Sequence, residues 1–374
     1  MIYFDNAATG GFKPNSVLET VNTVLKYLSA NPGRSGHRLS VTGANIVYDC
    51  RKSLAELFSA TPERVIFTKN CTEALNLAIF GTLKVGGHII TSIYEHNSVL
   101  RPLFYLQSKN LISLTVVTPS KEESLDKTIE KHITDKTYMV ALTCASNVTG
   151  EVLPFSLVGK LCKQRGILFL LDGAQGGGHL PISLKNDGVN LLALAGHKGL
   201  YGVMGSGALI IDENTQVSPV SFGGTGTQSF VKTQPEELPE RLETGTLNLP
   251  AIAGLNEGVN FISANLINFS ERLISATAQI INSLKAVSKV TVFSSPNPVG
   301  IVAFDVDGYD STEVCDILDK QYDIAVRGGA HCAPLMHEFL GTDKKGLVRA
   351  SLAVQNNGSE INHFLRAVNK IASR

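Results

Sequence analysis

Short apolar runs alternate with longer stretches of helical spacing through the first two-thirds of the chain. The apolar runs have the length and composition of β-strands. They lie at Val65–Thr68, His88–Tyr94, Leu111–Val117, Tyr138–Thr143, Ile167–Asp172, Leu191–Leu194 and Ala208–Ile211. The stretches between them predict helices at Ser40–Phe58, Thr72–Leu83, Asn97–Gln107, Ser124–His132 and Phe155–Gln164. This alternation predicts an α/β layer structure with a mostly parallel sheet, covered by helices on both faces.

The alternation stops at Asp212–Glu240, which begins rich in glycine and ends acidic and proline-bearing. We interpret this segment as a long functional loop or lid, because structureless loops of this length in compact domains usually have a function. One long helical pattern then runs from about Leu249 to Leu284.

The last part of the chain has a different order of elements. It predicts strands at Val290–Phe293, Gly300–Phe304 and near Leu347–Leu352, and helices at Thr312–Gln321 and from about Ser359. This difference in the order of elements predicts a large domain over residues 15–256. A smaller α+β domain would comprise residues 257–374 together with residues 1–14.

Composition narrows the classes of function. The 374 residues include 33 Lys plus Arg and 33 Asp plus Glu, so the formal net charge is zero. Nucleic-acid binding requires an excess of cations, so we expect no nucleic-acid partner. The start of the chain, Met1–Asn6, lacks the basic and apolar regions of a signal peptide, and no apolar run is long enough to span a bilayer. We therefore expect no membrane association.

The cysteines indicate a reducing compartment. There are six, and none has the CxxC spacing of a zinc ribbon or a thioredoxin-like site. We expect free thiols, a cytoplasmic location and no metal site.

Two polar residues lie at the ends of apolar runs that predict buried strands, and these positions are typical of a ligand-binding site. Asp172 ends one apolar run, and Lys198 follows another in Gly196-His197-Lys198. Ligands collect at the carboxyl ends of parallel strands. A desolvated lysine is a good Schiff-base nucleophile, and a carboxylate partners the ring nitrogen of pyridoxal phosphate (PLP). The alternatives are a surface lysine in a glycine-rich turn and an aspartate that only caps a helix.

Two further segments complete a possible cofactor site. Cys71 and Thr72 open a predicted helix after a strand, where backbone N–H groups and a hydroxyl suit a phosphate. His96 follows the next strand, and its imidazole could stack on an aromatic cofactor. The alternatives are an ordinary capped helix and a loop histidine bound to backbone.

The segment Arg327–Pro334 contains a candidate nucleophile. Its glycines indicate an exposed, mobile loop, and Cys332 has a histidine and Arg327 as neighbours that favour a thiolate. A buried structural thiol is the alternative. Arg349, a lone cation on a predicted strand, could hold a substrate carboxylate or form a surface ion pair.

In this order and spacing, these segments resemble class V aminotransferase-type PLP enzymes of fold type I. Within that family they resemble group II cysteine desulfurases and selenocysteine lyases. The segments that carry the resemblance are Tyr3–Thr9, Asn31–His37, Cys71–Glu73, Glu95–Asn97, Ser146–Gly150, Asp172–Gln175, Gly196–Lys198, Arg241–Thr246, the Cys332 loop and Arg349–Ser351. The resemblance implies a seven-stranded, mostly parallel sheet in the large domain and a small domain that carries the Cys332 loop.

The resemblance also implies roles for individual residues. Lys198 would bond to PLP and move the α-proton. The other cofactor contacts would be Asp172, Gln175 and His96 on the ring, and Cys71, Thr72 and His197 on the phosphate. Thr246 would reach the phosphate of a neighbouring subunit in a homodimer. Asn147, Arg327 and Arg349 would bind the substrate carboxylate.

The implied reaction is desulfuration of L-cysteine, with L-selenocysteine as an alternative substrate. Cys332 would take the sulfur as a persulfide, release L-alanine and pass the sulfur to an acceptor protein or thiol. Two departures from the family pattern are Ala195, where the family has a serine near the phosphate, and Ala330, where it often has a second histidine. Other class V reactions (transamination, epimerisation, kynureninase-like cleavage) and a non-catalytic persulfide carrier remain alternatives.

Overall fold

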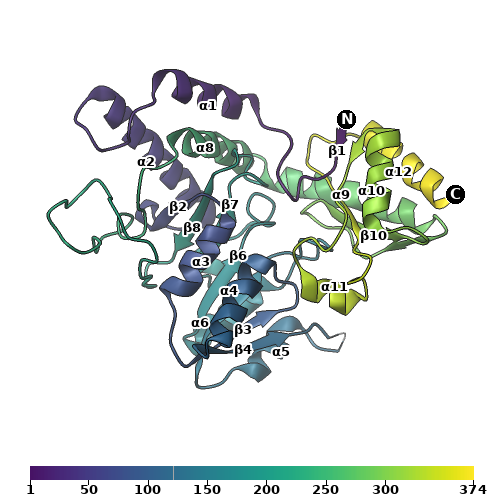
Figure 1. The fold of residues 1–374 in the computed structure, drawn as a ribbon, viewed down its shortest axis with the longest axis horizontal. Helices are drawn as coiled ribbons and strands as arrows, with labels where there is room; N and C mark the ends of the chain where they lie inside the picture. The colour runs from purple at the N-terminus through teal and green to yellow at the C-terminus, as the bar shows by residue number, and fades with distance from the viewer. Residues whose placement is uncertain (121) are drawn as a thin grey trace.

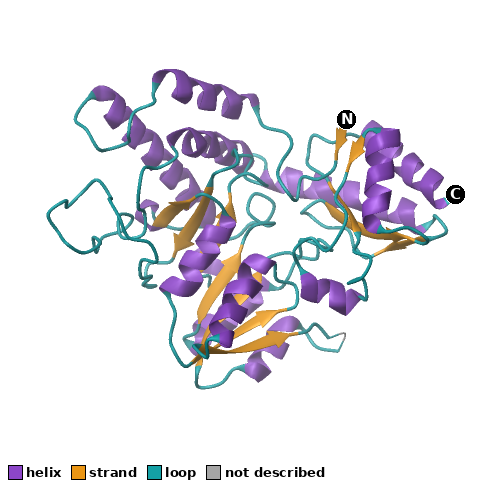
Figure 2. Cartoon of the chain, viewed as in Figure 1, coloured by secondary structure: helices purple, strands orange, loops and turns teal. Residues whose placement is uncertain are grey.

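The core of the large domain is a seven-stranded sheet (Figures 1 and 2). The computed structural model describes residues 1–120 and 122–374. In spatial order the strands are β2 (Val65–Thr68), β8 (Gly207–Ile211), β7 (Leu191–Ala195), β6 (Leu168–Asp172), β5 (Thr137–Thr143), β3 (Gly87–Ser92) and β4 (Ile112–Val117). Neighbouring strands from β7 to β4 are parallel, and only β8 runs antiparallel to its neighbours β2 and β7. The predicted mostly parallel, seven-stranded sheet is therefore confirmed.

Helices cover both faces of this sheet, because alternate residues of each strand enter different apolar clusters. Leu192 and Leu194 of β7 pack with residues of α2, α6 and α8, whereas Leu191 and Ala193 pack with residues of α3 and α4. The helices of this part are α1 (Asn15–Tyr27), α2 (Arg38–Phe58), α3 (Cys71–Gly81), α4 (Asn97–Ser108), α5 (Leu125–His132), α6 (Phe155–Arg165), α7 (Leu184–Asp187) and α8 (Leu249–Ser263), with a 3-10 turn at Pro62–Arg64. Because strands such as β7 are buried on both faces, they read as continuous apolar runs.

A second, smaller layer lies at the right of Figure 1. Its antiparallel sheet has β10 (Ile301–Val306) between β9 (Val290–Val292) and β12 (Val348–Ser351). The helices here are α9 (Leu266–Lys285), α10 (Ser311–Tyr322), α11 (Pro334–Leu340) and α12 (Gly358–Ala372). The chain begins in this layer, because β1 (Ile2–Tyr3) pairs with β11 (Ile324–Ala325) and Phe4 is buried in the same apolar cluster.

The predicted single helix from Leu249 to Leu284 is wrong. The structure has two helices, α8 and α9, which are separated at Asn265 by a non-helical backbone with φ −133° and ψ 0°. The apolar spacing continues across this break because α8 packs in a large-domain cluster and α9 in the small-domain cluster. The predicted domain boundary at residue 257 falls inside α8, and the division itself stays a prediction.

The segment between Ile211 and Leu249 contains no helix or strand, and every residue of it is described. This confirms the predicted long loop, which projects from the left side of the molecule in Figure 1. Among the described residues, no helix combines the length and the apolarity that crossing a membrane requires.

Candidate active site

One pocket lies at the carboxyl ends of the central parallel strands. Asp172 is the last residue of β6, and Lys198 comes three residues after β7, the parallel neighbour of β6. Eight of the residues singled out from the sequence line this pocket. They are Cys71, Thr72, His96, Asn147, Asp172, Gln175, His197 and Lys198. Parallel strands end at one edge of the sheet, so residues that are far apart in sequence meet there.

Two helices begin at the same end of this pocket. Asn70 caps α3 by accepting a hydrogen bond from the Glu73 N–H, and His96 caps α4 through its Nδ1. The hydroxyls of Thr72 and Ser98, in the first turns of α3 and α4, lie 2.8 Å apart. Helix N-termini attract anions. Two hydroxyls at two such ends therefore form a candidate phosphate site.

Ser98 is a pocket residue that the sequence analysis missed. It lines the pocket together with Ala195, the position that lacks the expected hydroxyl. Its hydroxyl contacts both the Thr72 hydroxyl and His96 Nδ1, at 2.8 and 2.9 Å. The sequence feature that could have identified Ser98 is its position two residues after His96, in the first turn of a helix.

Burial and charge set the protonation states in the pocket. Burial lowers the pKa of Lys198, while Cys71 and Asp172 oppose this shift. Burial also lowers the pKa of His96 to about 4, so its ring is neutral near pH 7. Cys71 donates its S–H to Asp172 Oδ1 at 3.4 Å, and burial raises its pKa, so it remains a neutral thiol. The pocket thus combines a carboxylate, an activated amine and a neutral imidazole.

The Cys332 loop lies against the start of α4. The backbone N–H of Asn97 donates to the carbonyl of Cys332 at 2.7 Å, and Asn147 Nδ2 donates to the carbonyl of His331 at 2.6 Å. Arg327 Nη2 lies 3.8 Å from the Cys332 sulfur. The predicted exposed loop is therefore wrong in part, because His331 is buried and Cys332 is half-buried.

Arg349 lies on β12 and is buried, with 1% of its surface exposed, so the alternative of a surface ion pair is wrong. Its Nη2 pairs with Asp5 at 3.0 Å, and its Nη1 donates to the carbonyl of Asn147 at 2.9 Å. Its Nε has no hydrogen-bond partner within the described chain. A buried donor without a partner is costly, so this N–H suits an anionic ligand such as a carboxylate.

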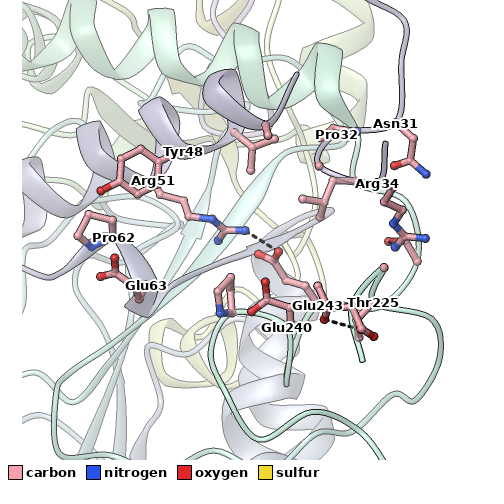
Figure 3. A pocket seen from close by; sticks show the side chains of 18 residues that line it. Asn31, Pro32, Arg34, Tyr48, Arg51, Pro62, Glu63, Thr225, Glu240 and Glu243 are labelled. Atoms are coloured by element: carbon pink, nitrogen blue, oxygen red, sulfur yellow. Dashed lines mark hydrogen bonds and ion pairs between the residues drawn. The ribbon is translucent and has the colours of Figure 1, made fainter. Parts of the chain in front are cut away.

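Thr246 does not lie in this pocket. It is exposed, and the segment that leads to it lines a separate cavity of about 290 Å³. In Figure 3 the guanidinium of Arg51, from α2, points at the carboxylate of Glu243. This buried pair has an N–O distance of 2.6 Å, and Glu243 also accepts from the Phe67 N–H of β2. The pair therefore ties the start of the Thr246 segment to α2 and β2.

Comparisons with known proteins agree over the whole chain. A family model described as aminotransferase class-V matches residues 2–364. A relative from Pyrococcus abyssi, named probable cysteine desulfurase, is 32% identical over 99% of this chain and 94% of its own length.

Solved structures give the same result. A cysteine desulfurase from Thermococcus onnurineus NA1, in its apo form, has a TM-score of 0.93 and 32% identity, covering 100% of this chain and 94% of its own. The cysteine desulfurase CsdA from Escherichia coli has a TM-score of 0.89 and 25% identity, covering 99% of this chain and 94% of its own. The similarity of fold therefore extends over the whole chain.

Proposed function

The chain belongs to the class-V aminotransferase family of PLP-dependent enzymes, and from this premise we propose that it is a cysteine desulfurase. It converts L-cysteine to L-alanine and takes the sulfur as a persulfide on Cys332. The observation that carries the proposal is the position of Cys332 in a loop bonded to the pocket residue Asn147, with Arg327 beside the thiol.

The donor set of the pocket fits PLP. Asp172 supplies a carboxylate for a ring nitrogen, and Lys198 supplies an amine for an aldehyde. Thr72, Ser98 and His197 supply polar groups for a phosphate beside the starts of α3 and α4. When bound, PLP withdraws electrons from the α-carbon of an amino acid.

The protein groups around the reacting carbon then have separate tasks. Lys198 moves the α-proton, because its lowered pKa favours the neutral amine that accepts it. Asp172 stays oriented through hydrogen bonds from Cys71 and from the backbone N–H of Ala174. Gln175 and His96, which line the same pocket, hold the cofactor ring in place.

The substrate carboxylate is held by the cationic side of the site. Arg349 offers its Nε, and Asn147 lies beside it in the pocket wall. Arg327 adds a second positive charge near Cys332. A fixed guanidinium positions a carboxylate and therefore the sulfur attached to the same substrate.

The sulfur step is a displacement at sulfur. The Cys332 thiolate attacks the substrate sulfur, an S–S bond forms as the Cβ–S bond breaks, and the electron pair left on the substrate is protonated to give L-alanine. A thiol or an acceptor protein then removes the persulfide sulfur. The nature of this acceptor and the cytoplasmic location stay predictions.

A homodimer completes the proposal. Thr246 and the apolar side chains of Phe222 and Phe230, all in the long loop between Ile211 and Leu249, are exposed in the single chain. Tyr27 and Tyr48, on α1 and α2, add further exposed apolar surface. Exposed apolar surface of this kind favours association. In the proposed dimer, Thr246 reaches the phosphate site of the partner subunit.

The test is the release of L-alanine from L-cysteine, in the presence of a reductant, by the PLP-loaded protein and by Cys332→Ala. Loss of alanine release in Cys332→Ala, with wild-type release by Cys315→Ala, supports sulfur uptake at Cys332. Equal release from all three proteins would overturn the role of Cys332. No release from the wild type would overturn the desulfurase proposal and favour another class V reaction or a persulfide carrier.

A further inference from the structure

Three buried polar side chains next to Cys332 have no task in the proposed reaction. His331 and His337 are buried, with ring planes inclined by 20° and ring centroids 5.6 Å apart. His331 Nδ1 lies 3.4 Å from His337 Nε2, and His337 Nδ1 lies 2.8 Å from the hydroxyl of Thr342. At the other end, His331 Nε2 lies 3.2 Å from the backbone carbonyl of Arg327. These groups form one chain of hydrogen bonds, which we call the histidine relay.

The proton positions in this relay follow from the backbone carbonyl at one end, because the Thr342 hydroxyl at the other end can rotate between His337 Nδ1 at 2.8 Å and the His337 carbonyl at 3.5 Å. The carbonyl of Arg327 can only accept, so His331 Nε2 carries the proton. Burial lowers the pKa of His331 to about 3, so the ring is neutral and its Nδ1 must accept. His337 therefore donates from Nε2, and its Nδ1 accepts from the Thr342 hydroxyl. Every ring nitrogen of the relay is satisfied, and all three bonds point in one direction.

The relay includes one of two consecutive residues with a left-handed backbone. His331 and Cys332 have φ values of 50° and 59°, in the left-handed region that side chains other than glycine rarely adopt. Such a turn persists only where surrounding contacts hold it. The carbonyls of both residues accept hydrogen bonds from α4 and from Asn147, but these bonds do not fix the rotation of the His331 side chain.

We propose that the histidine relay positions Cys332: Thr342 and His337 hold the His331 ring, which keeps the left-handed turn in the orientation that points the thiol at the substrate sulfur. His337 and Thr342 act through His331 and are positioning residues. The proposal rests on the proposed role of Cys332 as the sulfur acceptor. It assigns a function to α11 and to the turn that follows it, since these carry His337 and Thr342.

The test uses substitutions at Thr342, because this member of the relay is separated from His331 by two hydrogen bonds and is the most distant from Cys332 in the relay. Thr342→Val keeps the shape of the side chain but removes the hydroxyl that donates to His337, whereas Thr342→Ser keeps the hydroxyl. His337→Leu and His337→Gln form a second pair, because the glutamine amide can still donate and accept. Three quantities are measured on the PLP-loaded proteins. They are the shift of the cofactor absorbance on binding L-cysteine, the single-turnover rate of persulfide formation, and the alkylation rate of Cys332 without substrate.

We expect Thr342→Val to lower the single-turnover rate about 10-fold or more, since small misplacements of a reacting group cost this much. The binding shift should stay at its wild-type midpoint, and Thr342→Ser and His337→Gln should restore most of the rate. The alkylation rate of Cys332 should change in Thr342→Val, while that of Cys315, the other half-buried thiol, should not. A change in the alkylation rate of Cys332, without a change in that of Cys315, distinguishes a positioning role from a general loss of stability.

Wild-type persulfide formation in Thr342→Val would overturn the relay, and so would an equal loss in Thr342→Ser. A parallel rise in Cys315 alkylation would also overturn it, because the effect would then be loss of stability. If Cys332 were not the sulfur acceptor, so that the proposed function failed, the results would differ from those that overturn the relay. Cys332→Ala would release alanine normally, whereas the alkylation rates, which need no turnover, would still report whether the relay positions the thiol.

Discussion

The buried pair between Arg51 and Glu243 leads to a quantitative prediction. The side chains are only 7% and 8% exposed, and the N–O distance is 2.6 Å. Arg51 also donates to the carbonyl of Val65 and lies 4.6 Å from the ring centroid of Phe67. In Glu243→Gln the guanidinium stays in this dry site without its counter-charge. Removing one partner of a buried pair costs about 3–5 kcal/mol, a large share of the roughly 5–15 kcal/mol that stabilises a typical domain.

The matched control is an exposed pair with the same N–O distance. Arg165 and Glu130 also have an N–O distance of 2.6 Å, but their side chains are 53% and 46% exposed. Glu130→Gln should therefore cost less than about 1 kcal/mol. The two pairs have the same N–O distance and differ in burial and in the backbone contacts that accompany it, so the comparison measures what the buried environment adds to the cost of losing the counter-charge.

The assay is urea unfolding at low and high salt, in which the retention of bound PLP and the fraction of the proposed dimer are measured. The loss in Glu243→Gln should persist at high salt, because a buried pair is poorly screened. Arg51→Leu combined with Glu243→Leu should be more stable than either single variant, since no charge is left unpaired. A cost below about 1 kcal/mol for Glu243→Gln, equal to that of Glu130→Gln, would refute the reasoning.

Three further predictions concern the pocket residues Lys198 and Ser98 and the buried residue Glu95. Lys198→Ala should reduce alanine release to background in the same assay, because no other amine lines the pocket among the described residues. Ser98→Ala should weaken PLP binding about 5-fold to 10-fold, the effect of one hydrogen bond, whereas Ser108→Ala at the far end of α4 should leave it unchanged; equilibrium dialysis measures both. Burial raises the pKa of Glu95 from 4.5 to about 8, so the unfolded state loses this proton at a lower pH than the folded state. The free energy of unfolding should therefore fall as the pH rises from about 5 to 8, and Glu95→Gln should remove this component in urea titrations.

The sequence by itself determined the main sheet and eight of the residues that line the pocket. Strands β5 to β8 are buried on both faces, so each reads as a short apolar run of the kind that is typical of a covered parallel strand. Parallel strands end at one edge, so the proximity of Asp172 and Lys198 followed from their places after β6 and β7. The resemblance to PLP enzymes of fold type I is confirmed by the family match and by the solved structures.

Only the tertiary structure decided the partners of the buried polar groups. Asp5 pairs with Arg349 across 344 residues of sequence, and no local pattern contains such a contact. The break between α8 and α9 was hidden for a related reason, because both helices bury an apolar face, but in different clusters. The histidine relay likewise depends on how α11 packs behind the Cys332 loop. Periodicity records which residues are buried, whereas hydrogen-bond partners depend on which elements meet in space.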